Sequence, residues 1–235
     1  MTFFVDSGWN IGSQWTIQSY TVPTNLVLYL DAGNPSSYSG SGTTWTDLSS
    51  NNLSGTMNSG VSYSSSSGGS MVFDGTINAY VNFTGASSAT SLTNNFSIEA
   101  WYKSTNNLPQ ILSTGSGGSG LVFSSGSGAN ATKWKVTKYG VVDIYIGAVP
   151  QNTNWHQVVV TYSSTAGTVV YVDGAVSGTD ASTANLLAGT TNIPIGKGEY
   201  GYHSGSISIV RWYNTVLSSS DVSQNFNNNR SRFGI

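Results

Sequence analysis

Short runs of alternating apolar and polar residues recur along this chain from residue 25 onward. Residues 96–102 alternate over the length of a full strand, and residues 80–83 alternate as a half-buried strand should. The chain has the same character in many other short segments, and the sequence predicts further strands at residues 26–30, 44–48, 70–73, 110–113, 120–124, 133–137, 141–146, 155–162, 168–172, 193–196 and 205–213.

Turn residues separate these runs at short intervals. Asp74 and Gly75 follow one predicted strand, and Asp173 and Gly174 follow another. Many short strands with frequent turns are typical of an all-β sandwich or barrel, and the absence of alternating strands and helices excludes a parallel α/β fold. We expect an all-β antiparallel sandwich of the jelly-roll type, formed as one domain by residues 25–235. A Ser- and Asn-rich loop is expected after Leu48.

One helix is predicted, near the end of the chain. Ser218 and Asp221 have the spacing of a capping box, in which two orphan backbone N–H groups are satisfied reciprocally. Val222 and Phe226 lie four residues apart and therefore share one helix face. We expect a short C-terminal helix that lies against one end of the sandwich.

The first 24 residues differ from the rest of the chain. They are rich in aromatic residues and are closed by Pro23. One interpretation is an extra pair of sandwich strands; the other is an N-terminal β arm that adds strands to a partner protein. We predict an attachment arm whose partner-binding residues are Phe3, Phe4, Trp9, Trp15 and Tyr20.

Composition and charge narrow the classes of function. Charged residues make up 8% of the chain and the net charge is −2, so no dense basic face is available to bind nucleic acid or an anionic membrane. No cysteine is present, which excludes disulfides and thiolate zinc sites. The seven tryptophans argue for a folded core beneath a Ser-, Thr-, Asn- and Gly-rich surface.

The distribution of acidic residues bears on catalysis. A retaining glycosidase needs two carboxyl groups about 5–5.5 Å apart, which alternate positions of one strand supply. Glu99 is the only acid in its strand, and we expect no enzymatic activity. His156 is either a general base or a structural strand residue, and the second interpretation is preferred.

A small set of aromatic and imidazole side chains is suited to glycan binding. Sugars stack on exposed aromatic rings while Asn, Asp or Gln side chains bond their hydroxyls. The candidates are Trp134, Tyr200, Tyr202 and His203, and the alternative is that these are core or hairpin residues.

Four segments together resemble the laminin-G-like branch of the concanavalin A-like lectin/glucanase superfamily. They are residues 26–34 with 45–49, residues 73–75 with 80–81, residues 96–101 (FSIEAW), and residues 154–162 with 170–174. The resemblance covers residues 25–235 and implies a concanavalin-like sandwich. Many such domains bind calcium, but residues 205–210 lack the acid found there in several relatives, so a conventional calcium site is in doubt. Asp31, Asp47 and Asp74 remain candidate ligands, although each also fits an ordinary turn.

The C-terminal segments resemble the ending of laminin-G-like structural proteins of tailed bacteriophages. They are residues 213–218, 224–227 and 232–235. This resemblance implies a virion structural protein on the outer capsid surface. The main hypothesis is a trimeric decoration or cement protein that binds the major capsid protein and stabilises the lattice. The alternative is a tail or fibre domain that binds host-surface polysaccharide, and the third is a glucanase-like glycoside hydrolase.

Overall fold

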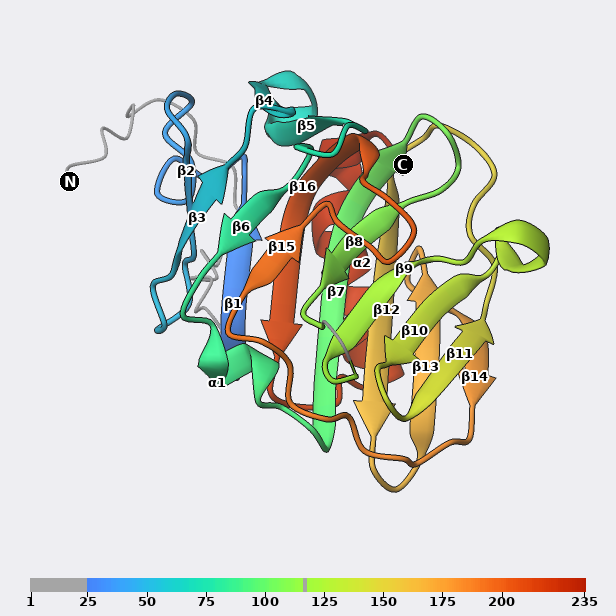
Figure 1. Cartoon of the computed structure of the whole chain (residues 1–235). Coiled ribbons are helices and arrows are strands. Elements are labelled where there is room, and N and C mark those ends of the chain that lie inside the picture. Colours follow the sequence, from blue (N-terminus) through green and yellow to red (C-terminus); the bar gives the residue numbers. More distant parts are fainter. Residues whose placement is uncertain (1–24, 116–117) are drawn as a thin grey trace, which may run out of the picture.

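The computed structural model describes residues 25–115 and 118–235. The expected attachment arm, with Phe3, Phe4, Trp9, Trp15 and Tyr20, lies outside these residues, so its structure is not part of the description. Two antiparallel sheets of eight strands each stack face to face (Figure 1). The prediction of an all-β sandwich with a short C-terminal helix is confirmed.

The first sheet has β7 and β16 at its centre. In spatial order its strands are β14 (Ala175–Asp180), β13 (Gly167–Val172), β12 (His156–Ser163), β7 (Asn95–Ser104), β16 (Ser204–Tyr213), β5 (Ser70–Asp74) and β4 (Val61–Ser64), and β1 (Leu26–Asp31) also pairs with β16.

The second sheet lies in front of the first in Figure 1. Its strands, in spatial order, are β11 (Val142–Ile146), β10 (Trp134–Lys138), β9 (Leu121–Ser125), β8 (Gln110–Ser113), β15 (Ile193–Ile195), β6 (Val81–Phe83), β3 (Ser54–Met57) and β2 (Thr44–Thr46). Both predicted hairpins, β10–β11 and β12–β13, are confirmed as antiparallel pairs.

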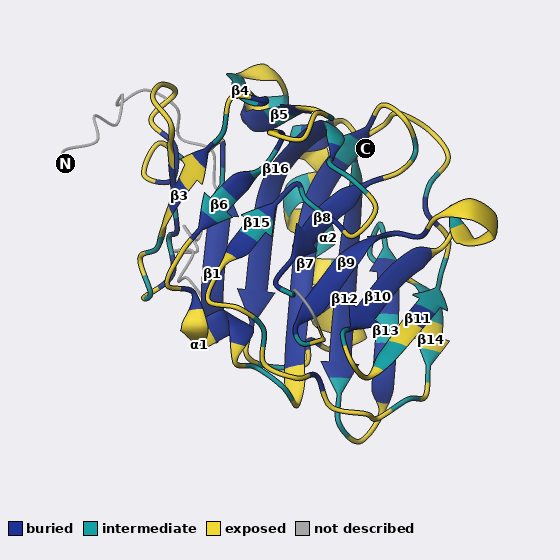
Figure 2. Ribbon diagram, in the orientation of Figure 1, coloured by how far each residue is buried: buried dark blue, intermediate teal, exposed yellow. Residues whose placement is uncertain are grey.

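The main core fills the space between the sheets. Large side chains from both inner faces are completely buried there, among them Trp45, Phe83, Phe123, Trp134 and Trp212. Figure 2 shows the buried strands and the exposed loops that join them. Burial of so much aromatic and branched apolar surface is the main source of stability in a chain without disulfides.

A second, smaller core lies on the outer face of the first sheet, beneath α2 (Ser219–Asn229) and the 3-10 turn η3 (Arg230–Phe233). The ring of Trp101 stacks on Phe226, with centroids 5.7 Å apart, and on Phe233 at 4.4 Å. The capping box predicted at Ser218 and Asp221 is present. Among the described residues, no helix is both long and apolar enough to cross a membrane.

Several short elements were not predicted. The segment after Leu48, expected as a loop, contains β3 and β4, and β14 follows the turn at Asp173. The helix α1 (Ser87–Thr90) and the 3-10 turns η1 (Ser66–Gly68) and η2 (Gly128–Asn130) were also missed. The strand β14 is an edge strand with largely exposed or half-buried side chains, and β3 and β4 are rich in Ser, Thr and Gly. Backbone pairing with neighbouring strands, rather than an apolar pattern, defines these three strands.

Candidate functional site

The outer face of the second sheet is polar where its inner face is apolar. In β6, Val81 and Phe83 are buried in the core, whereas Asn82 between them is half-buried and faces outward. Asn82 lies opposite Pro194 of β15 and Thr56 of β3 in the strand register. Because side chains alternate along the strands, amide and hydroxyl groups lie on the outer face of β3 and β6.

The loop of residues 196–203, between β15 and β16, packs against β8, β9 and β10 of the same sheet. A β-bridge joins Lys197 to Tyr202 and closes the loop. Gly198 packs so tightly on Gln110 of β8 that a Cβ atom there would overlap with the Gln110 amide. The missing side chain at residue 198 lets the loop backbone lie this close to the sheet.

This loop presents aromatic rings to solvent. Tyr200 is 50% exposed, and Tyr202 is partly exposed beside Tyr80, with ring centroids 6.1 Å apart. The ammonium of Lys197 lies 5.6 Å from the Tyr80 ring centroid and 5.8 Å from that of Tyr202. We refer to Tyr80, Tyr200 and Tyr202 as the tyrosine cluster.

A buried lysine holds Tyr200 in place. The side chain of Lys135 has no exposed surface, and its Nζ atom donates a hydrogen bond of 2.8 Å to the Tyr200 hydroxyl. The same ammonium pairs with Glu199 and, at 3.3 Å, with Asp143. Burial alone would lower the pKa of Lys135, but the hydrogen bonds to Glu199 and Tyr200 and the charge of Asp143 raise it above its ordinary value. Lys135 therefore remains a fixed cation beneath the cluster.

Two hollows lie on either side of the Tyr80–Tyr202 pair. The first has a volume of about 320 Å³, and its lining includes Tyr80, Asn82, Thr190, Asn192 and Lys197. The second, of about 240 Å³, is lined by Gln110, Ser127, Tyr200 and Tyr202 among others. The Gln110 Oε1 atom is buried without a hydrogen-bond partner among the described residues. Rings, amides and hydroxyls thus line both hollows.

Two of the four predicted glycan-contacting residues must be withdrawn. Tyr200 and Tyr202 lie together in the tyrosine cluster, but Trp134 and His203 are fully buried. Trp134 packs edge-on against Tyr102 in the main core, with centroids 5.6 Å apart. Neither buried ring can offer a face to a sugar.

His203 instead ties the loop to the first and second sheets. Its Nδ1 accepts a hydrogen bond from the Gln110 N–H at 3.3 Å, and its Nε2 lies 3.1 Å from the Lys103 carbonyl oxygen. This pair of contacts matches a neutral imidazole with its proton on Nε2. Burial lowers the pKa of His203 to about 4, despite the opposing effect of the Lys103 carbonyl.

The three candidate metal ligands serve local structure. Asp31 pairs with Arg232 at 2.8 Å, Asp47 is buried and accepts the Tyr29 N–H at 2.8 Å, and Asp74 closes the turn after β5. Within residues 25–115 and 118–235, no group of three or more His, Cys, Asp or Glu side chains is arranged to hold a metal ion.

Glu99, the acid of the β7 strand, lies beneath α2 and is completely buried. Its carboxylate accepts hydrogen bonds from Arg211 at 3.2 Å, Gln157 at 2.9 Å and Asn225 at 3.0 Å. The Trp101 indole also donates to it at 3.2 Å. These contacts give the carboxylate a structural role, as a link between the first sheet and the helix.

His156 has partners at both ring nitrogens. Its Nδ1 lies 2.7 Å from Asp173 and its Nε2 lies 2.9 Å from Asn152. The ring thus joins the start of β12 to the turn that follows β13. This arrangement agrees with the structural interpretation of His156.

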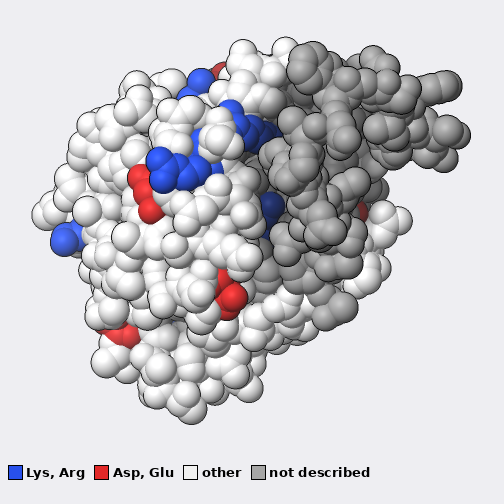
Figure 3. Space-filling view, turned by 180° about the vertical axis from the view of Figure 1, so that it is seen from behind, with Lys and Arg blue, Asp and Glu red and all other residues white. Residues whose placement is uncertain are grey.

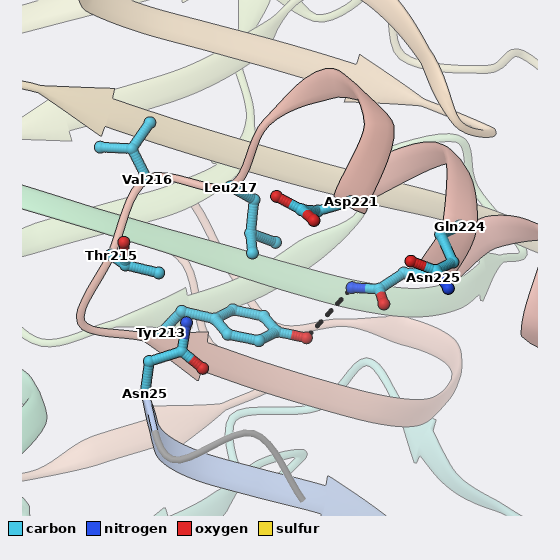
Figure 4. Close-up of a pocket in the computed structure, with 8 residues that line it drawn as sticks. All are labelled: Asn25, Tyr213, Thr215, Val216, Leu217, Asp221, Gln224 and Asn225. Atoms are coloured by element: carbon cyan, nitrogen blue, oxygen red, sulfur yellow. Dashed lines mark hydrogen bonds between the residues drawn. The ribbon is translucent and has the colours of Figure 1, made fainter. Parts of the chain in front are cut away.

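A further hollow, of about 360 Å³, lies where the end of β16 meets α2 (Figure 4). Asn225 donates a hydrogen bond of 3.1 Å to the Tyr213 hydroxyl there, and Asn25, Asp221 and Gln224 also line the hollow. Tyr213 is only 3% exposed, so this hollow offers amides but no stacking surface.

Sequence reasoning missed Tyr80, Asn82 and Lys197 as site residues. The alternation of residues 80–83 was recognised, and it already implied that Tyr80 and Asn82 share the face opposite Val81 and Phe83. No sequence pattern indicated that the loop after β15 folds back beside them.

Comparison with solved structures finds the same fold in much larger proteins. The botulinum neurotoxin serotype G binding domain matches with a TM-score of 0.67 at 14% identity, over 88% of this chain and 52% of that one. Botulinum neurotoxin type C, whose cell entry depends upon interaction with two ganglioside molecules, matches with a TM-score of 0.67 at 14% identity, over 87% of this chain and 51% of that one. A Trypanosoma rangeli sialidase matches with a TM-score of 0.62 at 16% identity, over 90% of this chain and 34% of that one. The chain therefore spans about half of the toxin chains and a third of the sialidase.

A comparison with curated protein sequences finds no match. A family model described as the concanavalin A-like lectin/glucanases superfamily matches residues 73–223, which is more than half of the chain. This match agrees with the two-sheet architecture and covers three of the four segments that carried the sequence resemblance, all but residues 26–34 with 45–49. The chain belongs to the concanavalin A-like lectin/glucanase superfamily.

Proposed function

We propose that this chain is a non-catalytic glycan-binding module and that the tyrosine cluster is its binding surface. The proposal rests mainly on the partly exposed Tyr80–Tyr202 pair, which lies between two hollows lined by amides and hydroxyls. Aromatic rings offer large apolar faces with little loss of side-chain entropy, and the neighbouring polar groups are suited to fix a sugar's orientation.

The two cations of the surface contribute differently. Lys197 lies over the rings of Tyr80 and Tyr202 and has no carboxylate partner among the described ion pairs, so its ammonium is available to sugar hydroxyls. Lys135 is neutralised by Glu199 and Asp143 and holds Tyr200. A rigid aromatic surface reduces the entropy cost of binding.

The fold supports this proposal at a coarser level. Chains of the same architecture occur in toxin binding domains, and one of these toxins depends on gangliosides for cell entry. At 14% identity that likeness concerns the fold, and the sugar specificity of this chain is a separate question.

Capsid decoration, the main hypothesis from the sequence, stays a prediction, together with the trimer, the major capsid protein partner and the virion location. Its attachment arm lies outside the described residues. Glycan binding takes precedence because its candidate residues Tyr200 and Tyr202 line the same surface hollow. A glucanase-like activity has less support, since Glu99 is buried in a structural network.

A glycan array probed with the purified chain tests the proposal. We expect binding to a restricted set of saccharides, and loss of that signal in the double variant Tyr200→Ala/Tyr202→Ala. Val176→Ala removes an exposed apolar side chain on the first sheet and serves as the matched control. Equal signals from the double variant and the parent chain would refute the assignment of the tyrosine cluster.

A further inference from the structure

A separate hollow lies on the outer face of the first sheet, where β4, β5, β16 and β7 meet. Val72, Ser206 and Lys103 are neighbours across three strands in the register, and they point away from the core that buries Met71, Tyr102 and Ile207. This face is the one seen from behind in Figure 3, where charged side chains are few.

The lining of this hollow is unusually rich in hydroxyl groups. Its volume is about 310 Å³, and the serines that line it are Ser64, Ser66, Ser67, Ser70, Ser204 and Ser206. Ser70 and Ser206 are only 2% and 4% exposed. Thr105 adds a further hydroxyl, held 2.7 Å from that of Ser204. Hydroxyls both donate and accept, and therefore suit a ligand that is itself rich in hydroxyls.

Lys103 is the only charged residue of the lining. No described carboxylate lies within ion-pair distance of its ammonium, in contrast to Lys135 and Arg232. The ammonium lies 5.5 Å from the ring centroid of Trp155, whose indole N–H donates to the Ser67 hydroxyl at 3.0 Å. The hollow therefore has one uncompensated positive charge.

The wall of the hollow is held rigidly by an ion pair. Arg232 donates to the carbonyl oxygens of Ser67, Gly68 and Gly69 in and after η1, and it pairs with Asp31 at 2.8 Å. The charges of that pair compensate each other, so they leave the charge of Lys103 unopposed.

We propose that this hollow is a second ligand site, which binds the carboxylate-bearing sugar unit of an acidic saccharide. Lys103 pairs with the carboxylate, and the serine hydroxyls bond the hydroxyls of the sugar ring. The site lies on the sheet opposite the tyrosine cluster and does not depend on the function proposed for that cluster. A charge-assisted hydrogen bond gives the site its preference for an acidic over a neutral sugar.

Calorimetric and NMR titrations with glucuronate, glucose and inorganic sulfate test the proposal. We expect glucuronate to bind and to shift the amide resonances of Lys103 and Ser206. Glucose should bind at least about tenfold more weakly, because it lacks the carboxylate that forms the charged hydrogen bond. Equal affinity for the two sugars, or binding of sulfate without glucuronate, would overturn the assignment to an acidic sugar.

Variants separate this site from the tyrosine cluster. Lys103→Gln should weaken glucuronate binding about tenfold or more and Lys103→Arg should retain most of it, whereas Lys133→Gln, which removes an exposed lysine outside the hollow, should have no effect. Tyr202→Ala should leave glucuronate binding at this hollow unchanged. Unaltered affinity in a folded Lys103→Gln variant, verified by circular dichroism, would contradict the proposal.

Discussion

The Nδ1 atom of His203 accepts a hydrogen bond of 3.3 Å from the backbone N–H of Gln110. This contact joins the end of the loop that bears Tyr200 and Tyr202 to the strand on which the loop rests. A proton on Nδ1 would point at another N–H group, so the contact requires a neutral imidazole. The integrity of the tyrosine cluster is thereby linked to the protonation of a completely buried residue.

Acid should destabilise the fold through His203. Its pKa is about 4 in the folded chain and 6.5 ordinarily, so the unfolded chain takes up the proton first as the pH falls. The stability due to neutral His203 is fully present above pH 6.5 and is lost as the pH falls through 4. For a pKa shift of this size, the free energy of unfolding should fall by about 3 kcal/mol in all. Urea unfolding between pH 7 and pH 4 measures it.

The variant His203→Gln is the control for this dependence. It cannot titrate in that range, so its free energy of unfolding should fall less between pH 6.5 and pH 4 than that of the parent chain. The same decline in both proteins would show that other groups cause the acid sensitivity.

Loss of Arg211 should be costly. Glu99 is completely buried and Arg211 nearly so, and removal of one partner leaves an uncompensated charge in the second core. We expect Arg211→Met to lower the free energy of unfolding by about 3–5 kcal/mol. Arg230→Met, at the exposed start of η3, should change it by no more than about 0.5 kcal/mol. Similar denaturation curves for the two variants would refute this role of the ion pair.

Loss of the capping box at the start of α2 should cause a smaller loss of stability. The Ser218 hydroxyl accepts the Asp221 N–H at 3.2 Å, and the Asp221 carboxylate accepts the Ser218 N–H at 2.9 Å. Ser218→Ala should cost about 1 kcal/mol in thermal or urea unfolding. Ser219→Ala removes an exposed hydroxyl one position later and should cost clearly less. If both substitutions cost the same, the cap does not stabilise α2 as described.

Alternation predicted most of the fold because each long strand has one face in the core. It failed for β3, β4 and β14, whose side chains are small, polar or exposed, because backbone pairing with the adjacent strands, rather than an apolar pattern, defines these strands.

The candidate site was predicted only in part. Trp134 alternates with Lys135 in β10, and this pattern already implied that Trp134 and Val136 face the core together. Tyr200 and Tyr202 lie in the loop between β15 and β16, where Tyr200 is exposed and Tyr202 half-buried, and their role as glycan contacts stays a prediction. Their proximity to Tyr80 depends on a loop that folds across the sheet, which needs the close approach at Gly198.

The affinity of a glycan identified on the array, measured by calorimetry with the parent chain and with Tyr202→Ala, tests the central claim most directly. Tyr202 contributes a ring to the pair between the two hollows, and loss of an aromatic contact of this kind typically costs more than 1 kcal/mol. We predict that Tyr202→Ala raises the Kd about tenfold and that Val176→Ala leaves it unchanged. An equal Kd for Tyr202→Ala and the parent chain would contradict the assignment of glycan binding to this surface.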